Sequence, residues 1–83
     1  MKLNSRFCEY IGWLGAALIL LAYALVAFQK LSVQNIWYPV MNLVGATAIV
    51  IHEGSQKDYA PTILNTVWAL VALVALARLV FQI

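Results

Sequence analysis

Charge is scarce in this sequence. Charged residues make up 10% of the 83 residues, whereas apolar residues make up 65%. In a typical soluble domain about a quarter of the residues are charged. A chain with as few polar groups as this one cannot cover the surface of a globule in water. The composition therefore excludes an ordinary soluble domain and makes the lipid bilayer the expected partner of the chain.

Basic clusters and cysteine pairs are also missing. The net charge is only +2, and the lysines and arginines are scattered rather than grouped, so no nucleic-acid partner is expected. The single cysteine, Cys8, excludes an internal disulfide and a cysteine metal cluster. Its expected role is that of a small apolar residue near the membrane boundary.

Residues that could act as acids or bases are few. Glu9, His52, Glu53 and Asp58 are the candidates, and all are expected near the membrane interface. The sequence has no metal-ligand spacing, no nucleophile beside a base and no glycine-rich phosphate loop. We therefore expect no enzyme activity, no metal and no cofactor. The favoured interpretation of His52 and Glu53 is a solvated loop between two helices.

Three long apolar segments take up most of the chain. At about 1.5 Å per residue, the first segment reaches roughly 28 Å, which crosses the hydrocarbon core of a bilayer. Pro39 and Pro61 fall in the first turns of the later two segments, where a missing N–H does little harm. The sequence predicts an all-α fold, a single transmembrane domain over residues 1–83 with consecutive spans at about 10–28, 36–51 and 60–81.

Small and polar residues share one face of each predicted helix. A lone amide in hydrocarbon costs several kcal/mol, so Asn42 is expected to face protein, as is Tyr23, and the two lie at one depth where they can bond each other. Asn65 lies level with Gly15, and Trp68 is far from both interfaces, so its N–H is expected to find a partner inside. Interhelical bonding alone is the competing interpretation of both asparagines. The candidate pocket residues are Gly15, Tyr23, Asn42, Thr62, Asn65 and Trp68.

A family resemblance covers nearly the whole chain. It rests on Ile11-Gly12, on Gly45 and on the run Ile63-Leu64-Asn65-Thr66-Val67. At this spacing the chain resembles the bacterial SemiSWEET half-transporters of the PQ-loop superfamily. Leu25-Val26 stands where that superfamily has its Pro-Gln pair, so the likeness is to a divergent branch. The resemblance implies a parallel homodimer of three-helix bundles around a sugar pocket, with Asn65 among the residues that line it.

Two functions remain open. The first is a homodimeric transporter or binder of a small solute, because three helices alone cannot enclose a solute path. The second is a structural or accessory subunit that packs against a larger membrane complex, which the short loops favour. The bacterial inner membrane is the expected location. Lys2, Arg6 and Lys57 outnumber Lys30 and Arg78 and favour a cytoplasmic N-terminus, whereas the family resemblance implies the reverse.

Overall fold

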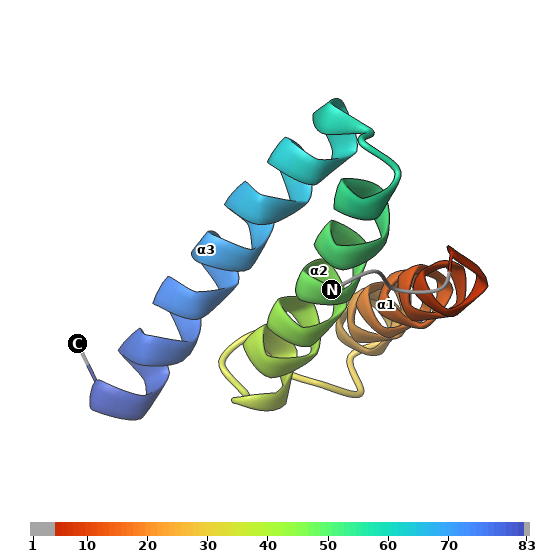
Figure 1. Cartoon of the computed structure of the whole chain (residues 1–83). Helices are drawn as coiled ribbons and strands as arrows, with labels where there is room; N and C mark the ends of the chain where they lie inside the picture. Colours follow the sequence, from red (N-terminus) through yellow and green to blue (C-terminus); the bar gives the residue numbers. More distant parts are fainter. Residues whose placement is uncertain (1–4, 83) are drawn as a thin grey trace.

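The protein is a row of three antiparallel helices. The computed structural model describes residues 5–82. Its helices are α1 (Ser5–Ala27), α2 (Trp37–Ser55) and α3 (Tyr59–Phe81), and α2 lies between the other two (Figure 1). The predicted all-helical class is confirmed. Lys2, one of the charges counted for orientation, lies outside the described residues.

The end of α1 is a Schellman motif, in which a left-handed residue lets the last carbonyls find donors. Gln29 is that residue, with a φ of 61°. The Lys30 N–H donates to the Leu25 carbonyl at 2.8 Å, and the Gln29 N–H donates to the Val26 carbonyl at 3.0 Å. The same pair of bonds recurs at the end of α2, around Lys57 with a φ of 56°. Both helices thus stop without the glycine that usually marks such an end.

The second helix is longer than the sequence predicted. It continues to Ser55, whereas the predicted end was residue 51, so His52 and Glu53 are helical rather than part of a loop. Polarity does not end a helix by itself. The chain leaves α2 at the Schellman motif around Lys57, and only residues 56–58 connect α2 to α3.

Glycines bring the backbones of α1 and α2 into contact. A Cβ added at Gly15 would lie 2.5 Å from the Gly45 carbonyl oxygen, and one added at Gly45 would lie 2.7 Å from the Gly15 carbonyl oxygen. Ala22 on α1 and Ala46 on α2 are fully buried. This packing of small residues is the kind that joins helices in membranes, where backbone approach replaces the hydrophobic effect.

Helix α3 packs on α2 alone. Within the described chain, no Cα atom of α1 comes within 8 Å of a Cα atom of α3. Ala72 is the buried residue of α3, while the valines and leucine of its opposite side are more than half exposed, namely Val67, Leu70, Val71 and Val74. The three helices therefore leave an open angle between α1 and α3, with α2 as its floor.

Two of the helices meet the length and hydropathy expected of a membrane span. They are Arg6–Ala27 and Tyr59–Phe81, whose mean hydropathies are 2.0 and 2.1. Helix α2 does not meet the same criterion among the described residues. Its sequence explains this, because it carries the polar residues Asn42, His52 and Glu53.

Candidate functional site

The open angle between α1 and α3 holds a groove of about 620 Å³. All three helices contribute to it. Four of the predicted pocket residues line it, namely Tyr23, Asn42, Asn65 and Trp68. Tyr38 and several aliphatic side chains complete the lining, and no charged side chain is among the described residues there. Small-molecule sites have volumes of about 300 to 1,000 Å³ with a few polar groups in a mostly apolar wall, so the groove has the dimensions of such a site.

Asn42 is the buried polar residue at the floor of the groove. It is only 7% exposed, which confirms the prediction that it faces protein. Its Nδ2 donates to the Tyr38 carbonyl of the preceding turn at 2.8 Å. Its Oδ1 accepts a hydrogen bond of 3.1 Å from the Trp68 Nε1–H. Both ends of the amide are therefore satisfied, one by its own helix and the other by α3.

Trp68 is the partner that the sequence had not assigned to Asn42. The prediction that the indole N–H finds a partner inside the protein is confirmed. Interhelical side-chain bonds of this type in membranes are worth about 0.6 kcal/mol on average and at most about 1.7 kcal/mol. The bond positions the Trp68 ring, which is 46% exposed, without holding it strongly.

Tyr23 lines the groove but does not face protein within the single chain. Its side chain is 67% exposed, and its hydroxyl makes no bond to Asn42. The expectation that Tyr23 is covered by protein is therefore wrong for one chain alone. The depth of the two residues agrees, but α1 is turned so that its glycines, and not Tyr23, meet α2.

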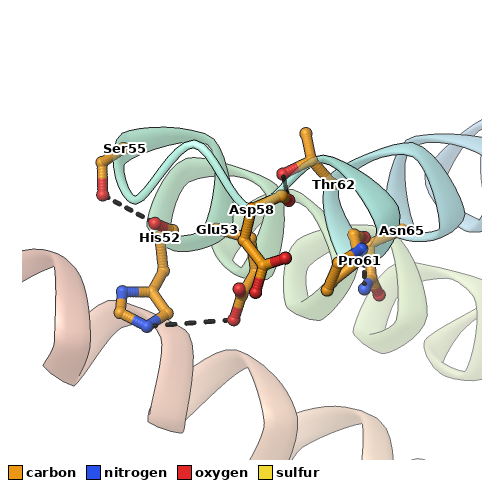
Figure 2. Close-up of polar contacts among 7 residues, drawn as sticks. All are labelled: His52, Glu53, Ser55, Asp58, Pro61, Thr62 and Asn65. Atoms are coloured by element: carbon orange, nitrogen blue, oxygen red, sulfur yellow. Dashed lines mark hydrogen bonds and ion pairs between the residues drawn. The ribbon is translucent and has the colours of Figure 1, made fainter.

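Asn65 lies at the wall of the groove with one end of its amide committed. Its Nδ2 donates to the Pro61 carbonyl at 3.0 Å, one turn back on α3 (Figure 2). Its Oδ1 has no hydrogen bond to any described residue. Asn65 does not join two helices, in contrast to Asn42, and it is one of the residues that line the groove.

Gly15 and Thr62 lie away from the groove. Gly15 is buried against α2, next to Gly45 and Ala48, so the space predicted between Gly15 and Asn65 is filled by another helix. The Thr62 hydroxyl donates to the Asp58 carbonyl at 2.6 Å and so belongs to the first turn of α3 (Figure 2). Equal depth along parallel axes did not reveal which way each helix is rotated.

His52 is a structural feature that the loop interpretation missed. Its ring points toward α1 (Figure 2) and lies over Gly12, where an added Cβ would be 2.7 Å from the imidazole carbons Cγ and Cδ2. Nε2 is 3.9 Å from Glu53 Oε1, and the buried Nδ1 has no hydrogen-bond partner. No group of three metal-ligating side chains occurs in the part of the chain that the structure describes. The spacing of Gly12 from Gly15 was the available signal that α1 has a closely packed face at this level.

A protein-family model matches residues 8–82. The chain belongs to that family. No curated protein and no solved structure matches the chain. The family's segment contains all three helices almost completely, the whole groove and both Schellman motifs. Nothing in this match links the family to PQ-loop or SemiSWEET proteins.

Proposed function

We propose that this protein is an integral membrane protein whose groove binds a small uncharged solute and, in a dimer, lets it pass. The observation that carries the proposal is the groove itself. It combines a suitable volume, about 620 Å³, with two amides and aromatic rings and without any charged lining residue among those described. An ionic solute would lose its hydration there without gaining a counter-charge, whereas an uncharged one would lose less.

A membrane location is supported by the exposed surface. Large apolar side chains are exposed along α1 and α3, and in water a continuous surface of this kind would cause association. Helix α2 has 19 residues, about 28 Å at the helical rise, so it is long enough for a third span. Because α1 and α3 cover it on two sides, it needs less hydropathy than its neighbours. We place the protein in a bacterial inner membrane, with the N-terminus on the cytoplasmic side as the basic residues favour.

A second copy is the proposed cover of the groove. One chain leaves the groove open between α1 and α3, and three helices do not enclose a path. A two-fold partner would turn its own groove toward the first. Tyr23, which is exposed in one chain, would then be covered by protein. The SemiSWEET-like packing expected from the sequence motifs is one form of such a dimer.

Asn65 is the proposed polar contact of the solute. Its Oδ1 is free to accept a hydrogen bond from a solute hydroxyl or amide, and the nearby Trp68 ring offers an apolar face. Stacking and a small number of hydrogen bonds are sufficient to orient an uncharged ligand.

Uptake into liposomes tests the proposal. Proteoliposomes are given D-glucose or D-mannitol as uncharged probes and L-glutamate as a charged one. We expect faster entry of at least one uncharged probe than in empty liposomes, and no effect on L-glutamate. Asn65→Ala should then lower that entry about tenfold, the loss expected for one hydrogen bond of about 1.4 kcal/mol. Thr62→Ala is the matched control, since Thr62 is on the same helix and outside the groove. Entry that is equal in empty and protein-containing liposomes would reject the transport function.

The alternative function is an accessory subunit of a larger membrane complex. The wide exposure of α3, where Ala72 is the buried residue, leaves a long apolar side for another membrane protein. Native mass spectrometry from mild detergent separates the two functions. A discrete dimer supports the solute binder, whereas recovery within a larger assembly supports the subunit.

A further inference from the structure

Trp68 stands between two hollows. The main groove is one of them, and a smaller hollow of about 150 Å³ is the other. Three residues line both, namely Tyr38, Asn42 and Trp68. The smaller hollow is completed by Pro39 in the first turn of α2 and by residues of α3 that follow Trp68, up to Ala75. It therefore extends from the groove toward the end of the molecule where α2 begins and α3 ends.

The hydrogen bond between Trp68 and Asn42 has a fixed side and a movable side. Asn42 is 7% exposed and is also tied to the Tyr38 carbonyl, so the acceptor stays in place. The indole makes a single hydrogen bond, and 46% of Trp68 is exposed. Of its neighbours one turn away on α3, Ala72 is buried, whereas Leu64 and Val71 are more than half exposed and leave the outer side of the ring open. If this contact breaks, the ring is the part that moves.

The smaller hollow can receive an aromatic ring. An enclosed apolar cavity of about 150 Å³ takes up a benzene molecule. The hollow next to Trp68 has about this volume and is open on one side, so it has room for the six-membered ring of the larger indole. Rotation between staggered side-chain positions would carry the indole from one hollow toward the other without a change in the helix. The space vacated at Asn42 would then join the two hollows.

We propose that Trp68 is a movable partition, held in its resting position by Asn42, which separates the main groove from the smaller hollow. With the bond made, the groove ends at the indole. With the bond broken, the groove continues along α2 and α3 toward the first loop. What passes through depends on the proposed function, but the movement itself is a property of the solute-free protein.

Nuclear magnetic resonance of the indole group tests this movement. In a Trp13→Phe/Trp37→Phe background, Trp68 is the remaining tryptophan of the three in the chain and gives the indole ¹⁵N–¹H signal. Two variants define the chemical shifts of the two ring positions. Asn42→Ala removes the acceptor and gives the free position. Ala75→Leu fills the smaller hollow with a side chain and so keeps the indole in the hydrogen-bonded position. Ala75 is exposed, and leucine has no aromatic ring that would itself shift the indole signal. Ala60→Leu, an exposed site that lines neither hollow, is the control.

The wild-type signal is expected to be an average of two positions, or a pair of signals if exchange is slow. Ala75→Leu should move an averaged signal to the chemical shift of the hydrogen-bonded indole, or leave only that signal of a pair. Asn42→Ala should move it to the chemical shift of the indole without this bond. Ala60→Leu should leave it unchanged. A wild-type signal identical to that of Ala75→Leu would mean that the ring never enters the hollow and would overturn the proposal. Because no solute is present, failure of D-glucose or D-mannitol to enter liposomes leaves this result intact, and the reverse also holds.

Discussion

The imidazole ring of His52 rests directly on Gly12, so the last full turn of α2 is packed against the first half of α1 through a position that has no side chain. A Cβ added at Gly12 would lie 2.7 Å from Cγ and Cδ2 of the His52 ring and 2.9 Å from the His52 Cβ. The contact sets how closely the two helices approach at this end, as Gly15 and Gly45 do nearer the middle.

Gly12→Ala should therefore destabilise the protein, by about 1–3 kcal/mol as expected for overpacking. His52→Ala removes the ring but keeps the Cβ, 2.9 Å from the added methyl. In the double variant Gly12→Ala should therefore cost less, though not nothing, with a coupling of about 0.5–3 kcal/mol. Thermal unfolding of the four proteins in mild detergent gives the coupling. Additive losses would show that the ring does not restrict Gly12.

Gly45→Ala is expected to be more damaging than Gly54→Ala. A methyl at Gly45 meets the Ile19 side chain at 2.6 Å and the Gly15 carbonyl at 2.7 Å, and backbone cannot move aside. A loss of about 1–3 kcal/mol is expected. Gly54 is the control within the same helix, because its added Cβ lies 4.0 Å from the nearest side-chain atom. There alanine should be neutral or stabilise the helix by about 0.5–1 kcal/mol. Equal melting temperatures for the two variants would contradict this packing.

Glycine at the left-handed positions should stabilise the protein. Gln29 and Lys57 have φ values of 61° and 56°, where a side chain costs roughly 1–2 kcal/mol in strain. Gln29→Gly or Lys57→Gly removes that strain, although glycine also gains freedom in the unfolded chain. The net effect expected is a gain of some tenths of a kcal/mol, up to about 1, in the free energy of unfolding. Gln34→Gly, in the same exposed loop as Gln29 but without a positive φ, should give no gain.

The two asparagines should respond differently to removal of the amide. Asn42→Ala breaks the bond between α2 and α3 and leaves the Trp68 N–H without its acceptor, so a loss of about 0.6–1.7 kcal/mol is expected. Asn65→Ala breaks only a bond within α3 and should change stability by a few tenths of a kcal/mol. The comparison is made by thermal unfolding in one detergent. A larger loss for Asn65→Ala would mean that this residue joins helices in a way that the single chain does not reveal.

Two arguments from the sequence predicted parts of the fold correctly: the length of the apolar segments and the cost of burying an amide. They gave three helices and the inward position of Asn42. They did not give the partner of Asn42, because the rotation of each helix is set where backbones touch, at Gly15 and Gly45. Depth arguments place residues along an axis and not around it. For this reason Gly15 was expected beside Asn65 and lies against α2 instead.

The helical end of α2 was missed for a different reason. Hydropathy detects the apolar middle of a helix, whereas its end depends on turn geometry. A glycine would have marked the turn, but Lys57 occupies the left-handed position. His52 and Glu53 consequently had the composition of a loop although they belong to the helix.

The backbones of α1 and α3 do not approach each other within the described chain, and this also bears on how the protein is made. Each helix packs only on its neighbour in sequence, so the contacts are local and little loop-closure entropy opposes them. The hairpin of α1 and α2 can form while α3 is still being synthesised, since its glycine contacts need nothing else. In this hairpin the Asn42 Oδ1 would have no hydrogen bond to another helix. When α3 packs on α2, the Trp68 Nε1–H would donate to that oxygen and complete the assembly.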